Sequence, residues 1–323
     1  MKSICLIIPY YGKFPNYFEL WLKSVEKNST IDFLLVTDIK ESYDYPSNVK
    51  IKNMTFNELK TQVQSLYDFK ISLDNPYRIV DFKVAYGELF YEYIKKYDFW
   101  GYCDVDLIFG DIRKFVTEEI LNQYDKINLH GHFSLHKNCD EMRHLYKKTS
   151  KNIIDYKTAF KVNWTWHFDE YPGVSYICKD NDIKYIDLED YADISWQYHK
   201  FLKVYDHSEK KSDDYKINQI FCWENGKLYN LIVNNGEVKK NEIMYIHLQK
   251  RNMKNRADKN VERFFIVPNS FVTEIDSISV ETVKKYSQDI EINALKEFKK
   301  KCFWDRFKIN YWRYKIAMRG KRK

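Results

Sequence analysis

Two aspartates separated by one residue, Asp104 and Asp106, lie just after residues 97–102, a largely apolar segment whose composition predicts a buried β-strand. Hard divalent cations such as Mn²⁺ and Mg²⁺ prefer carboxylate oxygens and keep coordination positions for water and phosphate. The triplet, with Val105 at its centre, therefore predicts a site that holds Mn²⁺ or Mg²⁺ against a diphosphate. Aspartates are also frequent where strands end in turns, so the prediction depends on which other residues can join them.

His247 is suited to join the acidic pair. It ends a predicted strand and is followed by Lys250 and Arg251. A neutral imidazole completes a metal site with two carboxylates, so we expect His247 to be the third ligand. A lysine three residues later can neutralise the charge of a departing diphosphate, and Lys250 is predicted to do so. The alternative is a structural histidine at the end of a strand.

Two further carboxylates, Asp169 and Glu170, lie in an aromatic segment, residues 164–171. Aromatic faces stack on sugar rings, and carboxylates accept hydrogen bonds from sugar hydroxyls. A carboxylate among apolar neighbours also has the raised pKa that a general base requires. We therefore predict catalytic or hydroxyl-binding roles for both residues. The alternative is a half-buried aromatic strand with a solvated acidic end.

Two loops carry residues suited to a nucleotide. Pro9, Tyr10 and Tyr11 end the first predicted strand, and a tyrosine ring at that position can stack on a base. Asp38 ends the second predicted strand, where it can hold a base or a ribose. Ordinary loops that bury tyrosines or form turns share both features.

Three charged residues near the start of a predicted helix are further candidates for binding the nucleotide. Arg78, Asp81 and Lys83 lie close to the beginning of the helix expected over residues 77–97. From that end of the helix their side chains can reach a phosphate or a ribose. A solvated helix face explains the same charges equally well.

The elements that position these residues follow a strand, helix, strand order. Apolar runs at residues 3–8 and 33–36 predict strands buried on both faces, and apolar positions recur at helical spacing in residues 15–27. A third strand is expected at residues 49–54. This order predicts an α/β fold whose sheet presents its ligand site at the carboxyl ends of the strands.

The later part of the chain is predicted to be less regular. Two Asn-Gly pairs, at residues 225–226 and 235–236, predict the tight turns of an antiparallel patch that ends at residues 244–247. The other elements expected after the acidic pair are helices at residues 111–122 and 141–150, a short strand at residues 126–130, and an exposed loop at residues 206–214.

Composition excludes several protein classes. The chain has 323 residues, of which 44% are hydrophobic, enough for one large domain or two ordinary ones, and disorder is not expected. The six cysteines show no paired spacing, which argues against a zinc ribbon and provides no disulfide framework. No segment has the roughly 18 apolar residues of a membrane span or the core of a signal peptide, so a cytoplasmic location is expected.

Positive charge is concentrated at the C-terminal end. Residues 296–323 carry a net charge of +10 in a chain whose total is +7, so residues 1–295 carry −3. Phe303, Phe307 and Tyr311 recur at helical spacing among the basic residues, which predicts an amphipathic helix. Such a helix suits an anionic membrane surface. The alternatives are docking on the body of the protein and, less favoured, nucleic-acid binding.

In their order along the chain, these motifs resemble bacterial glycosyltransferases of the GT-A fold that build capsule and lipopolysaccharide. The resemblance covers residues 1–255 and is carried chiefly by the Asp-x-Asp triplet and by His247 with Lys250. It implies a Rossmann-like mixed sheet flanked by helices. The expected division is a transferase domain at residues 1–270 and a helical basic tail at residues 271–323.

Within that domain, the resemblance implies a nucleotide-sugar half, residues 1–110, and an acceptor half, residues 111–270. The implied activity is metal-dependent transfer of a hexose or N-acetylhexosamine from a UDP-sugar to a glycan or lipid-linked glycan, at the inner face of the cell membrane. The late histidine implies retention of anomeric configuration. Residues 130–134 replace the small-residue acceptor loop of these enzymes, so the resemblance leaves the acceptor and the stereochemistry open.

Two other classes remain as alternatives. A metal-dependent phosphohydrolase also needs clustered carboxylates and histidines. A non-enzymatic protein that binds nucleic acid or a membrane through its basic tail is the second alternative.

Overall fold

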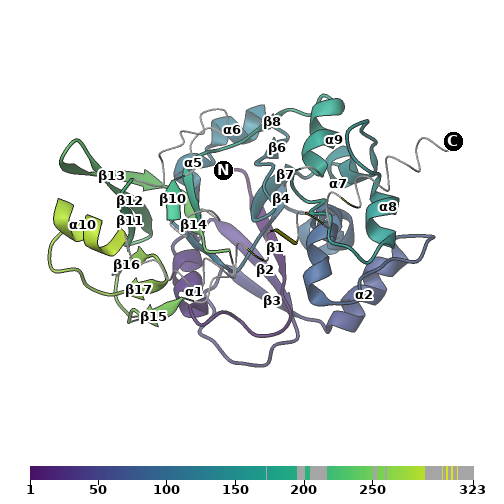
Figure 1. Cartoon of the computed structure of the whole chain (residues 1–323). Helices are drawn as coiled ribbons and strands as arrows, with labels where there is room; N and C mark the ends of the chain where they lie inside the picture. Colours follow the sequence, from purple (N-terminus) through teal and green to yellow (C-terminus); the bar gives the residue numbers. More distant parts are fainter. Residues whose placement is uncertain are drawn as a thin grey trace.

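In the computed structural model the helices and strands form a mixed α/β structure, with sheets flanked by helices (Figure 1). None of its helices has both the length and the apolarity that a membrane crossing requires, within the part of the chain that is described. The structure describes residues 1–171, 173–194, 201–203, 217–249, 253–258 and 260–287, and the single positions Lys300, Phe303, Trp304, Phe307 and Tyr311.

The central sheet contains the predicted buried strands. β1 (Ile4–Pro9), β2 (Ile31–Thr37) and β3 (Val49–Asn53) are parallel, and β4 (Phe99–Cys103) pairs in parallel with β1. These four strands confirm the predicted elements. The described strands of this sheet follow the order β3-β2-β1-β4-β7-β6-β8, where the last three are β7 (Phe133–Lys137), β6 (Lys126–Ile127) and β8 (Tyr185–Ile186).

Helices cover both faces of this sheet, which explains why its strands are apolar on both sides. Leu6 packs in a cluster with α1 (Phe18–Glu26), whereas Ile7 packs in another with α2 (Phe56–Ser65). Successive residues of a strand point to opposite faces, so both faces need apolar side chains. The α1 layer also holds α5 (Ile112–Phe115) and α6 (Glu118–Gln123), and the α2 layer holds α8 (Tyr156–Lys161) and α9 (Val174–Asp180).

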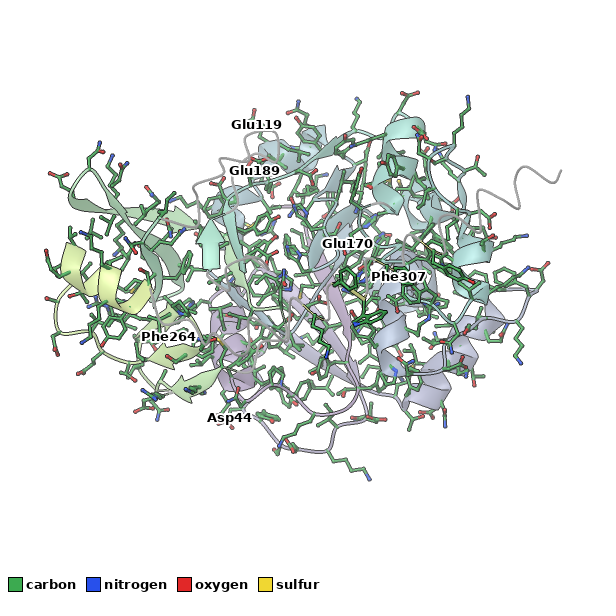
Figure 2. All side chains as sticks on the ribbon, viewed as in Figure 1. Asp44, Glu119, Glu170, Glu189, Phe264 and Phe307 are labelled. Atoms are coloured by element: carbon green, nitrogen blue, oxygen red, sulfur yellow. The ribbon has the colours of Figure 1, made fainter. Side chains whose placement is uncertain are left out.

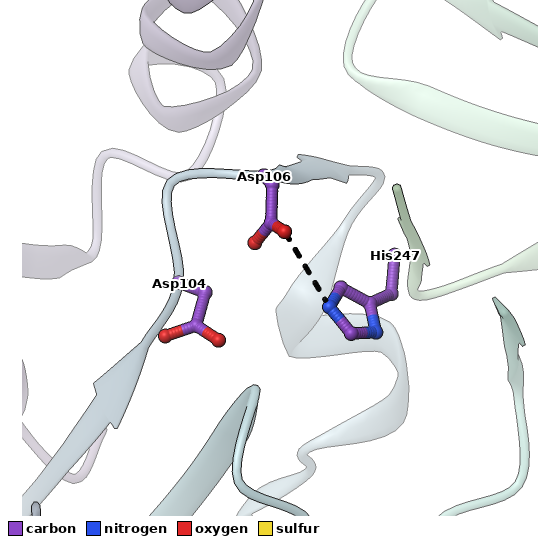
Figure 3. Close-up of side chains that lie close together, drawn as sticks. All are labelled: Asp104, Asp106 and His247. Atoms are coloured by element: carbon purple, nitrogen blue, oxygen red, sulfur yellow. Dashed lines mark ion pairs between the residues drawn. The ribbon is translucent and has the colours of Figure 1, made fainter. Parts of the chain in front are cut away.

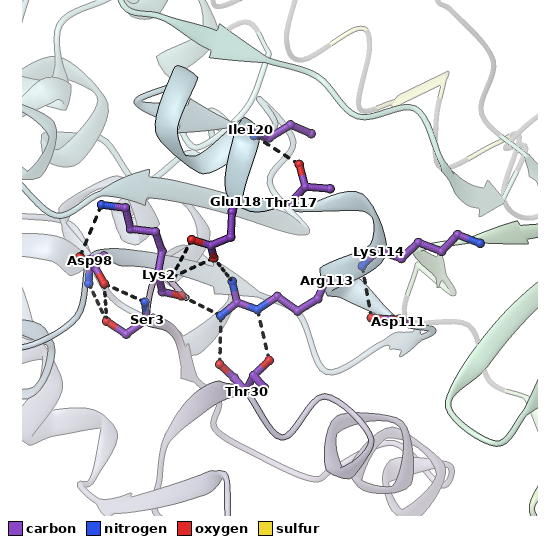
Figure 4. A network of polar contacts seen from close by, with 10 residues as sticks. All are labelled: Lys2, Ser3, Thr30, Asp98, Asp111, Arg113, Lys114, Thr117, Glu118 and Ile120. Carbon is purple, nitrogen blue, oxygen red and sulfur yellow. Dashed lines mark hydrogen bonds and ion pairs between the residues drawn. The ribbon is translucent and has the colours of Figure 1, made fainter.

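A polar network holds the amino ends of the strands. The Ser3 N–H donates to Asp98 Oδ2 at 2.8 Å, which ties the start of β1 to the start of β4. Arg113 donates to the Lys2 carbonyl at 2.8 Å and to the Thr30 carbonyl at 3.1 Å (Figure 4). Because these contacts align one end of the strands, the carboxyl ends also lie side by side.

The predicted helix at residues 77–97 is wrong in its form. The segment is a 3₁₀ helix, η1 (Pro76–Ala85), followed by two short helices, α3 (Tyr86–Leu89) and α4 (Tyr91–Ile94). Nearly every residue from Arg78 to Ala85 is buried. A spacing rule for helices with one buried face does not apply to a segment that is enclosed on almost all sides.

Two other predicted helices are each divided. Residues 111–122 form α5 and α6, because the Thr117 side chain accepts from the Ile120 N–H and caps a new helix. Residues 141–150 give only α7 (Asp140–Arg143) and a 3₁₀ turn, η2 (Leu145–Lys147).

Both predicted hairpin turns are confirmed. They join β11 (Gln219–Glu224), β12 (Lys227–Asn234) and β13 (Glu237–Ile243), and Asn225 and Asn235 have a φ of 50°. Positive φ is what an Asn-Gly hairpin turn requires. These strands belong to a second sheet of order β13-β12-β11-β16-β17-β15, with β16 (Arg263–Val267), β17 (Ser270–Val272), β15 (Lys254–Arg256) and, packed against it, α10 (Val280–Ser287).

The predicted end of this patch at residues 244–247 is wrong. β14 (Tyr245–His247) leaves the hairpin sheet and joins a third sheet of order β10-β9-β14-β5. It pairs antiparallel with β5 (Leu107–Phe109) and parallel with β9 (Tyr191–Ile194), and β10 (Phe201–Lys203) lies at the edge. Pairing between strands so far apart in sequence leaves no local signal.

Candidate metal site and ligand cavity

The acidic pair, Asp104 and Asp106, lies at the carboxyl end of β4. The chain passes from Cys103 through this pair before β5 begins. The Asp104 N–H donates to the His132 carbonyl at 3.0 Å. The Asp106 side chain is 4% exposed and that of Asp104 is 27% exposed. The pair therefore lies at the predicted edge of the central sheet, with one carboxylate buried and the other more accessible.

β14 brings His247 to the same edge. It pairs with β5 so that His247 lies opposite Leu107, the residue after Asp106. The Leu248 N–H donates to the Asp106 carbonyl at 2.8 Å and extends the pairing. Single ligand atoms of Asp104, Asp106 and His247 all lie within 4.8 Å of one another (Figure 3). The three residues predicted as metal ligands thus converge.

This group fits a divalent cation. Two carboxylates and an imidazole form a mixed oxygen and nitrogen donor set that suits Mn²⁺. His247 Nε2 is 3.7 Å from Asp106 Oδ2, and Nδ1 is 3.1 Å from Asp193 Oδ1. Because Asp193 contacts Nδ1, Nε2 faces the acidic pair. A carboxylate behind the ring orients many metal-binding histidines in this way.

The charge of His247 is set by its neighbours. Burial lowers the pKa of His247, but Asp193 and Asp106 outweigh burial and raise that pKa well above its usual value. His132 stacks on His247 with ring centroids 4.3 Å apart, and burial followed by His247 holds the pKa of His132 well below its usual value. Of the two stacked rings, His247 is thus the one whose protonated form its neighbours favour.

A cavity of about 400 Å³ opens beside the acidic pair. Three segments line it: the loop after β1, the 3₁₀ helix η1 with Tyr86, and the turn after β4. Its size is within the range of sites for small molecules. Several residues predicted to bind the nucleotide or the metal are in the lining, namely Pro9, Tyr10, Tyr11, Lys83, Asp104, Val105 and Asp106.

Lys83 connects Asp104 to a second acidic pair, Asp169 and Glu170. Its Nζ donates to Asp104 Oδ1 and to the Gly131 carbonyl, both at 2.7 Å, and lies 3.6 Å from Asp169 Oδ2. The Gly131 N–H donates to Glu170 Oε2 at 3.2 Å, and Figure 2 shows Glu170 over the middle of the molecule. A Cβ at Gly131 would lie 2.6 Å from Asp169 Oδ2, so a larger residue here would have to displace the Asp169 carboxylate.

The two carboxyl groups of the second acidic pair differ in protonation. Burial raises the pKa of Asp169 to about 7, while Lys83 opposes and Glu170 adds to the rise. Burial also acts to raise the pKa of Glu170, but His167, at 3.2 Å, and the Gly131 N–H hold that pKa below its usual value. The surroundings therefore favour the anionic form of Glu170 and, compared with an ordinary carboxyl group, the protonated form of Asp169.

Arg78 and Asp81 do not line the cavity, and their contact with a nucleotide stays a prediction. The Arg78 side chain is 3% exposed, pairs with Asp81 and donates to backbone carbonyls within residues 159–164. Asp81 accepts from the N–H groups of Trp166 and Phe168, at 3.1 and 2.9 Å. Buried charges that are bonded in this way fasten the segment leading to the second acidic pair.

The remaining predicted residues lie elsewhere. Asp38 is exposed at the end of β2 and is not part of the cavity lining, although burial and then the charge of Asp38 raise the pKa of Tyr11. Lys250, predicted to act on the diphosphate, lies outside the described residues, as do the loop at residues 206–214 and most of the tail, residues 296–323.

A family model described as a family of unknown function (DUF6625) matches residues 6–275. The chain belongs to this family. The matched region contains every residue of the candidate site, so the acidic pair and His247 lie inside the part of the chain that identifies a DUF6625 protein. Among curated proteins, none matches the chain.

Several site residues of this DUF6625 protein were missed from the sequence. Asp193 lies in a short strand among many acidic residues, and only the parallel pairing of β9 with β14 shows that it meets His247. Tyr17, Tyr77 and Tyr86 line the cavity but follow apolar spacings typical of core residues. The available signal was the abundance of tyrosine, 27 residues, which does not distinguish among them.

Replacing Asp81 by alanine is expected to destabilise the protein strongly. The substitution leaves the buried Arg78 guanidinium without its ionic partner, which costs about 3–5 kcal/mol at comparable sites. Urea denaturation followed by circular dichroism measures the loss. Asp74→Ala is the matched control, because it removes a carboxylate that is 53% exposed from the neighbouring segment. Equal stability of the two variants would contradict the role given to Asp81.

Mn²⁺ binding is expected to strengthen as the pH rises. Below the raised pKa of His247 its ring carries a proton, which a metal ion must displace. The association constant should rise by up to about tenfold per pH unit while the pH is below the raised pKa of His247, and should level off once that pKa is passed. The free energy of unfolding of the ion-free protein should instead fall as the pH rises. Protonated His247 contributes fully to this stability below about pH 6.5, its ordinary pKa, and the contribution is lost as the pH rises through its folded pKa.

Isothermal titration calorimetry with MnCl₂ in buffers of different ionisation enthalpy measures both the affinity and the protons released. The His247→Gln variant should lose the pH dependence together with most of the affinity. His144→Gln, which removes an imidazole that is 38% exposed, should behave as the wild type does. A flat affinity profile in the wild type would show that His247 does not coordinate the ion.

Proposed function

We propose that this protein is a metal-dependent glycosyltransferase of the GT-A type. It would move a hexose or N-acetylhexosamine from a UDP-sugar to a glycan or lipid-linked glycan in cell-surface polysaccharide synthesis. The observation that carries the proposal is the convergence of Asp104, Asp106 and His247 beside a tyrosine-lined cavity at the carboxyl ends of parallel strands. A nucleotide bound to a metal needs both parts of this arrangement.

Asp104, Asp106 and His247 are the residues proposed to hold Mn²⁺ or Mg²⁺. The ion, when bound, supplies positive charge that neutralises the diphosphate of the donor. Asp193 keeps the His247 ring oriented toward the acidic pair. Lys250 is proposed to stabilise the departing UDP, since positive charge is most useful where negative charge develops.

The tyrosine-rich loop after β1 is proposed to hold the nucleoside. Tyr10 and Tyr11 follow Pro9, the last residue of β1, and both line the cavity. Tyr10 stacks on Phe14 with ring centroids 5.1 Å apart, and Tyr11 packs edge-on against Phe56 at 5.4 Å. Rings that are fixed in this way present an ordered surface to a base, with little loss of side-chain freedom on binding.

Lys83 and the second acidic pair are proposed to act on the sugar side of the site. Lys83 lies between Asp104 and Asp169, so its ammonium keeps two carboxylates close without repulsion. Glu170, held as an anion, accepts hydrogen bonds from hydroxyl groups. Asp169, with a pKa of about 7, is the group suited to take a proton from the acceptor if the configuration is inverted.

The two-metal phosphohydrolase gains less support. Such an enzyme needs a second set of ligands close to the first. In the described part of the chain, Asp104, Asp106 and His247 form one group of clustered ligands, with no second group beside it. Release of phosphate from simple esters, without a sugar nucleotide, would nevertheless favour that alternative.

Substitution of Asp106 is expected to abolish Mn²⁺-dependent release of UDP from UDP-sugars. Changes to groups that merely orient a metal ligand cost about 10–100-fold, so loss of a ligand should cost more than about 100-fold. The measurement is UDP release from a panel of UDP-sugars with Mn²⁺, with EDTA, and with a glycan acceptor. Asp106→Asn, which keeps the shape of the side chain, is tested beside Asp106→Ala.

Asp98→Asn is the matched control, because it removes a carboxylate from the opposite end of the same strand region. It should retain metal-dependent activity once its folding has been verified. Normal turnover by the Asp106 variants would dismiss the metal site. Wild-type protein that neither binds nor cleaves any sugar nucleotide would dismiss the transferase.

The basic tail is proposed to hold the enzyme at an anionic membrane surface. Residues 296–323 carry a charge of +10, and each basic residue near such a surface contributes on the order of 1 kcal/mol. Among the described tail residues, Phe303, Trp304 and Phe307 are 65%, 51% and 59% exposed, so their rings are available to the interface.

The full-length protein should therefore sediment with vesicles that contain phosphatidylglycerol and not with neutral vesicles, and added salt should weaken the binding. Replacing Trp304 and Phe307 together by serine should reduce sedimentation. Replacing Tyr93, a 39% exposed ring on α4, should not. Retention of RNA without vesicle binding would assign the tail to nucleic acid instead.

A further inference from the structure

Three tyrosines that line the cavity have hydroxyls whose hydrogen-bonding capacity the described residues do not use. Tyr11, Tyr17 and Tyr86 all line the cavity. Their hydroxyl oxygens are buried and have no hydrogen-bond partner among the described residues. Tyr17 and Tyr86 are each only 1% exposed. A buried polar group without a partner is costly, so these hydroxyls require an explanation.

Buried tyrosines outside the cavity lining do have partners. The Tyr102 hydroxyl donates to the Asp169 carbonyl at 3.0 Å. Tyr146 bonds to the Tyr67 hydroxyl at 2.9 Å and to a Glu88 oxygen at 2.7 Å. Tyr245 is 3.0 Å from His132 Nε2. Among the described residues, the buried tyrosine hydroxyls without a hydrogen-bond partner therefore all belong to tyrosines that line the cavity.

Tyr17 and Tyr86 approach the cavity from different elements. Tyr17 immediately precedes α1, and its ring packs against Phe271 of β17 with centroids 5.4 Å apart. Tyr86 is the first residue of α3 and packs edge-on against Tyr102 at 6.3 Å. The acidic pair lines the same cavity. A ligand beside that pair would therefore lie between two tyrosines: Tyr17, in the segment that joins β1 to α1, and Tyr86, where η1 meets α3.

The Tyr17 and Tyr86 hydroxyls have different charged neighbours, which suggests that each would contact a different part of a ligand. Burial and then Asp106 raise the pKa of Tyr17, whereas burial and then Asp104 and Asp169 raise that of Tyr86. Both groups therefore remain neutral and can donate a proton in a hydrogen bond. Tyr17 packs in one cluster with Ile108 and Leu248, which lie within two residues of Asp106 and His247. Tyr86 packs against Tyr102, whose hydroxyl bonds to the Asp169 carbonyl in the second acidic pair.

We infer that Tyr17 and Tyr86 are specificity-determining donors for a nucleoside-diphosphate sugar. The Tyr17 hydroxyl donates to a diphosphate oxygen beside Asp106, and the Tyr86 hydroxyl donates to a hydroxyl of the sugar that is transferred. The third open hydroxyl, that of Tyr11, lies in the loop already proposed to hold the nucleoside. This inference rests on the proposed function and adds to it how the two ends of the donor are distinguished.

The test uses Tyr17→Phe and Tyr86→Phe in the full-length protein. Calorimetry with Mn²⁺ measures the affinity for UDP and for whichever of UDP-glucose, UDP-galactose, UDP-N-acetylglucosamine and UDP-N-acetylgalactosamine the wild type binds most tightly. Tyr17→Phe should weaken binding of UDP and of the UDP-sugar by roughly tenfold or more, because a hydrogen bond to a charged oxygen is lost. Tyr86→Phe should weaken only the UDP-sugar, by roughly threefold to tenfold, because its partner is neutral.

Thermal unfolding without ligand gives a second readout. Each cavity variant should be as stable as the wild type or more stable, because phenylalanine removes a buried hydroxyl that has no partner. Tyr146→Phe is the matched control: it removes two existing hydrogen bonds of a tyrosine outside the cavity lining, so it should lower the melting temperature and leave the affinity unchanged. Reduced affinity with undiminished stability separates ligand recognition from a packing role.

The outcomes distinguish the inference from the function on which it rests. Wild-type binding that is unchanged in both cavity variants overturns the inference and leaves the transferase standing. Equal losses for UDP and UDP-sugar in Tyr86→Phe overturn the assignment of that hydroxyl to the sugar. Absence of nucleotide binding by the wild type overturns both proposals together.

Discussion

The pairing of β14 with β5 is the contact on which the candidate site depends. It sets His247 opposite Leu107, and therefore next to Asp106, although the two strands are far apart in the chain. The same short strand pairs on its other side with β9 and places Asp193 against the second ring nitrogen of His247. Backbone hydrogen bonds thus determine both which imidazole reaches the acidic pair and which way it faces.

His247 is packed against several neighbouring side chains and does not project alone from a loop. His132 stacks between His247 and His130, at 4.3 and 5.2 Å, and contacts the Tyr245 hydroxyl. Its loop continues into Gly131, which contacts Lys83 and the second acidic pair. A displacement of either acidic pair therefore meets resistance from several elements, which favours a site formed before any ligand binds.

The parts of the fold that were predictable are those with a local cause. Buried parallel strands need apolar side chains on both faces, so β1 and β2 were recognised from their composition. The Asn-Gly turns were recognised because few other residues accept positive φ. The Asp-x-Asp triplet was interpretable because it follows a buried strand. In each case a few adjacent residues contain the whole physical reason.

Contacts between residues far apart in the chain were not predictable from the sequence. The charges of Arg78 and Asp81 suit a ligand, but the sequence did not indicate that both side chains hydrogen-bond to the backbone of residues 159–168. The helical spacing that predicted a single helix after Asn75 took no account of the enclosure of η1 on nearly all sides. Tertiary contacts likewise decide which sheet β14 joins, because the sequence of β14 suits either sheet.

Each carboxylate of the Asp-x-Asp triplet has a cation of the protein's own. Lys83 contacts Asp104, and protonated His247 faces Asp106, so mutual repulsion is already offset in the bare chain. Lys83 and the His247 ring therefore let two carboxylates lie close together at the edge of the central sheet. If the proposed ion binds here, it would replace the proton of His247 at a site whose negative charge the chain already offsets.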